Sequence, residues 1–130
     1  MHSKNFLHLL QGKRILVVED EYFLADETRR KLEVLAAEVI GPVASVEDAI
    51  ALIEAEIVDG AILDVYLGDE FVFPVADKLE ALDIPFVFAT GYDQSVLPDG
   101  FPGFLLCEKP TELSNIARAL FGDRNCDDLQ

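Results

Sequence analysis

Four short hydrophobic runs in this 130-residue chain each end in a polar residue, and this repeated pattern constrains the fold more than any other feature. In chain order the polar residues are an acidic pair, Glu19-Asp20, followed by Asp64, Thr90 and Lys109. In an open parallel α/β sheet, ligands bind at the carboxyl ends of the strands, beside the point where the strand order reverses. We therefore expect these polar groups to converge on one crevice.

Hydrophobic periodicity predicts strands that alternate with helices five times along the chain. The expected strands cover residues 13–19, 39–43, 61–64, 85–89 and 104–107. Helices are expected at about residues 21–37, at 46–55, from about 73, at 93–97 as a short or poorly formed turn, and at 111–121. Alternation with short connections implies an α/β fold, a doubly wound parallel sheet with right-handed crossovers. The flavodoxin-like strand order 2-1-3-4-5 is the natural five-stranded solution.

Two prolines refine these boundaries. Pro42 interrupts the second strand, and because proline cannot donate to a ladder, this strand is expected at a sheet edge or strand end. Pro74 suits the first turn of a helix that begins at about Phe73. Residues 65–72 are then left as a loop lying over the crevice. Ser45 is expected to cap the second helix.

The composition excludes several classes of function. A net charge of −15 argues against nucleic-acid binding, which needs an excess of Lys and Arg. Such charge attracts a basic partner surface, although a solvated acidic face explains it about equally well. The two cysteines show no metal-binding spacing. The sequence contains neither a membrane-length apolar stretch nor a secretory signal, so we expect a cytoplasmic protein.

The three acids of the crevice, Glu19, Asp20 and Asp64, favour a cation, because clustered carboxylates otherwise repel one another. These residues provide only oxygen ligands, so the ion should be a hard cation, Mg²⁺ or Mn²⁺. We expect Asp20 and Asp64 to bind it directly and Glu19 to bind through water, with a phosphoryl donor completing the shell. Lys109 and Thr90 would contact phosphoryl oxygens, and Asp64 would be the nucleophile that forms an acyl phosphate.

Over about residues 13–121 the chain resembles the receiver domain of two-component response regulators. The matching segments are Val17–Glu21 for the acidic pocket, Ile62–Val65 for the phosphoacceptor, Thr90 and Lys109-Pro110. The resemblance implies Mg²⁺-dependent phosphotransfer from a histidine kinase to Asp64, with the backbone carbonyl of Tyr66 among the metal ligands. It also implies a signalling domain rather than an enzyme, with self-catalysed phosphotransfer and dephosphorylation.

A more specific resemblance concerns the segment Pro85–Tyr92, PFVFATGY. It is similar to the FAT GUARD subgroup of single-domain response regulators, which implies a kinase of the HWE type as partner. Receivers commonly carry an aromatic residue three positions before the lysine, and that position is Leu106 here. We therefore expect phosphorylation to act through residues 91–103 rather than through the usual aromatic rotation.

The expected organisation is an N-terminal arm at residues 1–12, a receiver domain at 13–121 and a disordered tail at 122–130. So short a tail predicts a stand-alone domain whose output is protein–protein binding or phosphate relay. One alternative is an aspartate-nucleophile phosphohydrolase, but Tyr66 stands where that class carries a second Asp. The other is a pseudo-receiver that is never phosphorylated, and the complete set of pocket residues counts against it.

Overall fold

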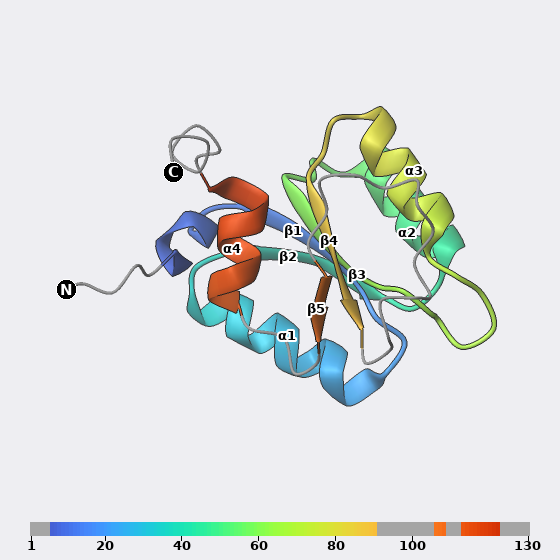
Figure 1. The fold of residues 1–130 in the computed structure, drawn as a ribbon, viewed down its shortest axis with the longest axis horizontal. Coiled ribbons are helices and arrows are strands. Elements are labelled where there is room, and N and C mark those ends of the chain that lie inside the picture. The colour runs from blue at the N-terminus through green and yellow to red at the C-terminus, as the bar shows by residue number, and fades with distance from the viewer. Residues whose placement is uncertain (1–5, 91–105, 109–112, 123–130) are drawn as a thin grey trace.

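The computed structural model describes residues 6–90, 106–108 and 113–122, and its centre is a parallel five-stranded sheet (Figure 1). The strand order is β2-β1-β3-β4-β5, as expected for a flavodoxin-like fold. The strands are β1 (Arg14–Val18), β2 (Glu38–Val43), β3 (Gly60–Asp64), β4 (Phe86–Thr90) and β5 (Leu106–Glu108). The flavodoxin-like α/β class predicted from the sequence is therefore confirmed.

Helices cover both faces of the sheet (Figure 1). They are the 3-10 helix η1 (Leu7–Leu10) and the α-helices α1 (Tyr22–Val34), α2 (Val46–Ala55), α3 (Phe73–Ala81) and α4 (Leu113–Phe121). Helices α2 and α3 pack on one face, whereas α1, α4 and η1 share the other. The described residues thus contain four α-helices, not five, because the expected helix at 93–97 lies outside them. The first two residues of the expected last helix, 111 and 112, and the tail from residue 123 also lie outside them. Within the described part of the chain, none of the helices combines the length and the hydrophobicity that a membrane span needs.

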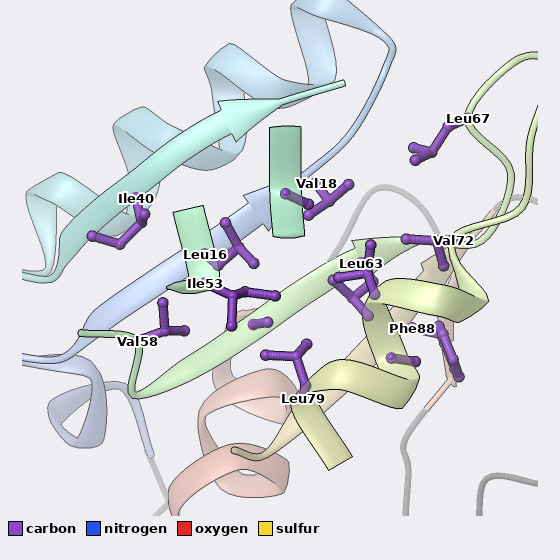
Figure 2. Close-up of a cluster of buried hydrophobic side chains, with 14 of the residues drawn as sticks. Leu16, Val18, Ile40, Ile53, Val58, Leu63, Leu67, Val72, Leu79 and Phe88 are labelled. Carbon is purple, nitrogen blue, oxygen red and sulfur yellow. The ribbon is translucent and has the colours of Figure 1, made fainter. Parts of the chain in front are cut away.

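Two hydrophobic cores form because alternate residues of a strand point to opposite faces of the sheet. On β1, Leu16 and Val18 join the core beneath α2 and α3, which also contains Leu63 and Phe88 (Figure 2). The other two inner residues of β1 join the core beneath α1 and α4. Burial on both faces explains why β1 and β3 read as continuous apolar runs rather than as alternating patterns.

Helix α1 ends at Val34, three residues before the position expected from its apolar stripe. The backbone turns at Ala36, which has a left-handed φ of 67°. The amide of Ala37 then donates to Leu32 O and that of Ala36 to Glu33 O, both at 3.0 Å. These two bonds form a Schellman motif, whose left-handed position is usually occupied by glycine. The missing glycine is why the sequence pattern did not locate the end of the helix.

The other local expectations agree with the structure. Helix α2 spans Val46–Ala55, and Ser45 Oγ accepts the amide of Asp48 at 3.1 Å. Helix α3 begins at Phe73 with Pro74 in its first turn. Strand β2, which contains Pro42, lies at an edge of the sheet.

Candidate functional site

Three carboxylates meet at the carboxyl ends of β1 and β3, which are hydrogen-bonded neighbours. Strand β1 ends at Val18, which pairs with Leu63, so Glu19 and Asp20 leave the sheet beside Asp64. One carboxylate oxygen from each of Glu19, Asp20 and Asp64 lies within 4.8 Å of the others. The structure therefore brings together the three acids that were selected from the sequence.

Burial differs sharply among these acids. Asp64 is only 5% exposed, whereas Asp20 is exposed and Glu19 is intermediate. The cause is the sheet itself, because β3 is its central strand and both of its faces are covered. The cluster consequently has a buried inner acid and a solvated outer one.

Two hydrogen bonds fix Glu19 at the start of the loop between β1 and α1. Glu19 N–H donates to Val43 O at 2.9 Å, and Glu19 Oε2 accepts the amide of Glu21 at 3.0 Å. Glu21 in turn caps α1, since its Oε1 accepts the amides of Phe23 and Leu24 at 3.0 and 3.3 Å. Sequence patterns do not reveal this cap, because glutamate is not among the preferred N-cap residues.

The segment after Asp64, residues 65–72, was expected to be a loop over the site, and it is a closed turn anchored in the core. Val72 N–H donates to Val65 O at 2.9 Å, and both side chains are fully buried. Tyr66 and Phe71 form an antiparallel bridge with their rings 5.1 Å apart. We call residues 65–72 the β3–α3 turn.

The β3–α3 turn approaches the acidic cluster at Gly68. Gly68 has a φ of +87°, and a Cβ atom placed on it would lie 3.2 Å from Asp20 Oδ2. A glycine at this point allows both the left-handed backbone and the close approach. Gly68 is not among the site residues expected from the sequence, although an isolated glycine between a strand and a helix is a signal for such a turn.

The chemistry of these ligands fits a hard divalent cation. All three groups are carboxylates, and such oxygen donors suit Mg²⁺ or Mn²⁺ rather than softer ions. Carboxylate oxygens this close repel one another unless positive charge lies among them. The expected Mg²⁺ or Mn²⁺ is therefore compatible with the geometry of Glu19, Asp20 and Asp64.

The remaining residues selected from the sequence lie at the same end of the sheet or beyond the described part. Asp64 pairs with Ala89, so Thr90, the last residue of β4, follows directly at the carboxyl end. Thr90 pairs in turn with Glu108, the last residue of β5. Lys109 is the next residue along the chain and lies outside the described residues.

Comparison with known proteins places the chain in a family, although no family model matches it. The sensory transduction protein LytT of Bacillus cereus is 38% identical over 87 residues, which are 65% of this chain and 35% of LytT. The chain thus spans about a third of the length of the curated relatives it matches.

Two solved structures combine similar sequence with the same fold. SdrG from Sphingomonas melonis Fr1 is 42% identical, with a TM-score of 0.73 over 84% of this chain and 93% of SdrG. A response regulator from Burkholderia pseudomallei, with a phosphorylated aspartic acid, calcium ion and citrate, is 26% identical, with a TM-score of 0.72 over 91% of this chain and 71% of that protein. The fold and these similarities show that the chain belongs to the response regulator receiver domains.

Proposed function

We propose that this receiver domain accepts a phosphoryl group on Asp64 from a histidine kinase, in a reaction that requires Mg²⁺ or another hard divalent cation. The observation that carries the proposal is the convergence of Glu19, Asp20 and Asp64 within 4.8 Å at the carboxyl ends of two neighbouring strands. The Burkholderia response regulator with a phosphorylated aspartic acid supports the same chemistry.

In the proposed reaction an Asp64 carboxylate oxygen attacks the phosphorus of the donor. The bond from phosphorus to the donor's imidazole nitrogen breaks, and an acyl phosphate forms on Asp64. A bound cation would offset the negative charge that collects around the transferring group. Asp20 and Asp64 would hold that ion directly, Glu19 through water, and Tyr66 through its backbone carbonyl.

Two further residues would contact the phosphoryl oxygens. By resemblance to the family, the Thr90 hydroxyl donates a hydrogen bond to one oxygen and the Lys109 ammonium pairs with another. The position of Thr90, at the same end of the sheet as Asp64, supports this role. The domain would catalyse its own phosphorylation and dephosphorylation, and it would not act as an enzyme on other substrates.

The partner proposed for phosphotransfer is a histidine kinase of the HWE type. The support is the FAT GUARD-like segment Pro85–Tyr92, most of which forms strand β4 beside Asp64. Output would be binding to a further protein or phosphate relay in the cytoplasm. The proposed switch region, residues 91–103, lies outside the described residues.

The experiment is incubation with acetyl phosphate and Mg²⁺, followed by intact mass spectrometry and mapping of the modified residue. We expect one added phosphoryl group on Asp64 and none after chelation of the metal. Asp64→Asn should remain unlabelled, because an amide is no nucleophile. Asp77→Asn is the matched control, since Asp77 is an exposed acid on α3, and it should be labelled like the wild type.

Different outcomes identify the two alternatives. A protein that binds Mg²⁺ and is never labelled would be a pseudo-receiver. Continuous release of phosphate from small monoesters, dependent on Asp64, would indicate a phosphohydrolase. Undiminished labelling of Asp64→Asn would remove Asp64 from the proposed role.

A further inference from the structure

Glu70 stands outside the acidic cluster, and its side chain crosses from the β3–α3 turn to another element. Glu70 Oε2 accepts the backbone amide of Val46 at 3.0 Å, in a part-buried bond between residues 24 positions apart. Val46 is the first residue of α2. Amides of a first helical turn lack an acceptor within their helix, and negative charge is favoured there. Glu70 therefore fastens the β3–α3 turn to the start of α2.

The main chain of Glu70 also shapes the turn. Leu67 N–H donates to Glu70 O at 2.8 Å, and the side chain of Leu67 is buried. Gly68 follows Leu67 directly and makes the close approach to Asp20. Glu70 thus makes two connections. Its side chain binds the start of α2, and its carbonyl binds the part of the turn that lies next to the acidic cluster.

We propose that Glu70 is a positioning residue for the cation site, an inference that rests on the proposed function. By holding the turn against α2, it sets where Gly68 meets Asp20 and where the backbone of Tyr66 runs next to Asp64. A site that binds Mg²⁺ through few protein ligands depends strongly on such placement, because this ion demands near-ideal geometry. Groups that orient ligands without contacting the metal affect its affinity in the same way.

The same helix terminus offers a matched control. Ser45 Oγ accepts the amide of Asp48 at 3.1 Å, so Ser45 also caps α2. This hydrogen bond joins the N-cap residue of α2 to a residue in the first turn of the same helix, and it involves no residue of the β3–α3 turn. Loss of either cap weakens the start of α2, whereas loss of Glu70 alone also releases the turn.

The test is the affinity for Mg²⁺ of the full chain, measured by calorimetry below the melting range of each variant. Glu70→Ala should weaken binding roughly 10-fold, at the lower end of the effects seen for groups that orient metal ligands. Glu70→Gln should stay within about 3-fold of the wild type, because its amide oxygen still accepts the Val46 amide without charge assistance. Ser45→Ala should bind like the wild type.

Amide hydrogen exchange of the metal-free protein is a second, independent test of whether Glu70 holds the β3–α3 turn. The amide of Leu67 should exchange faster in Glu70→Ala than in Ser45→Ala, since only the first variant releases the turn. Unchanged Mg²⁺ affinity in Glu70→Ala, or an equal loss in Ser45→Ala, would overturn the positioning role. A wild-type protein that binds no Mg²⁺ would instead refute the proposed cation site, and with it this inference.

Discussion

The backbone of Gly68 lies so close to Asp20 that a Cβ atom on Gly68 would sit 3.2 Å from Asp20 Oδ2. Gly68 belongs to the turn after β3, and Asp20 to the loop after β1. Two loops from neighbouring strands therefore approach each other at the candidate site, and any side chain on Gly68 would press on Asp20. A substitution that moves the backbone of either loop should therefore shift the position of the other.

Gly68→Ala should lower both stability and Mg²⁺ affinity. The left-handed backbone at φ +87° disfavours alanine, at a cost of about 1–2 kcal/mol in the free energy of unfolding, and the methyl group crowds Asp20. Urea denaturation with chelator present measures the first effect, and calorimetric titration the second. Gly12→Ala is the control, because Gly12 has a similar φ of +77° but nothing within 4 Å of its Cβ position. Equal loss of affinity in both variants would refute the contact with Asp20 as the cause.

Mg²⁺ should raise the melting temperature, because the ion binds the assembled site and not the unfolded chain. At a concentration 100-fold above its dissociation constant, the ion should add about 2.7 kcal/mol to the free energy of unfolding. Asp20→Asn and Asp64→Asn should abolish most of this gain, and Glu19→Gln should reduce it less. Melting curves with and without millimolar Mg²⁺ are the measurement, with Asp77→Asn as the unaffected control. A wild-type melting temperature indifferent to Mg²⁺ would contradict a cation site.

Ala36→Gly should stabilise the protein. Ala36 has a left-handed φ of 67° in the Schellman motif after α1, where glycine carries no penalty. Relief of this conformation outweighs the added freedom of the unfolded chain, so we expect a gain of about 0.5–1 kcal/mol in the free energy of unfolding. Urea denaturation gives the value. Ala51→Gly, at an exposed position inside α2, should destabilise by about 1 kcal/mol.

The stabilising effect of Asp26 should be lost in acid. A hydrogen bond from Arg29, 2.6 Å between Nη2 and Oδ1, lowers the pKa of Asp26 below its ordinary value, and the nearby charges of Arg29 and Arg30 act in the same direction. A lowered folded-state pKa gives stability that is complete above the unfolded-state pKa and disappears as the pH falls through the folded-state pKa.

We therefore expect the stability difference between wild type and Asp26→Asn to shrink below about pH 4. An NMR titration of the Asp26 carboxyl should show the low pKa directly. Arg29→Met should move that pKa back toward its ordinary value. A pKa of Asp26 that does not respond to Arg29→Met would contradict the assignment.

The elements that the sequence predicted well are those with a local signature. Strand β3 is recognisable because burial on both faces leaves an unbroken apolar run ending in Asp64. The meeting of Asp64 with Glu19 and Asp20 follows from topology alone, since parallel neighbours end at the same edge of the sheet. Pro74 marks the start of α3 because its ring fits a first helical turn.

Two kinds of feature could not be predicted from the sequence. One is a contact between residues far apart in the chain, and the other is a structural position occupied by a residue type that is unusual there. The hydrogen bond from the Val46 amide to the Glu70 carboxylate joins residues 24 positions apart, and no sequence pattern in either segment predicts it. Helix α1 ends at an alanine where glycine is usual. In the first case a contact between distant segments decides, and in the second the left-handed position carries a residue that does not mark it.

Strand β2 has a consequence for the behaviour of the protein at high concentration. It forms one border of the sheet, and the edge strand of a sheet is where a second chain can add its own strand. Here the row of backbone donors is interrupted at Pro42, next to a shift in pairing between Leu16 and Val18 of β1. This border is a poor template for intermolecular strand addition, so β2 should not be where concentrated protein associates edge to edge.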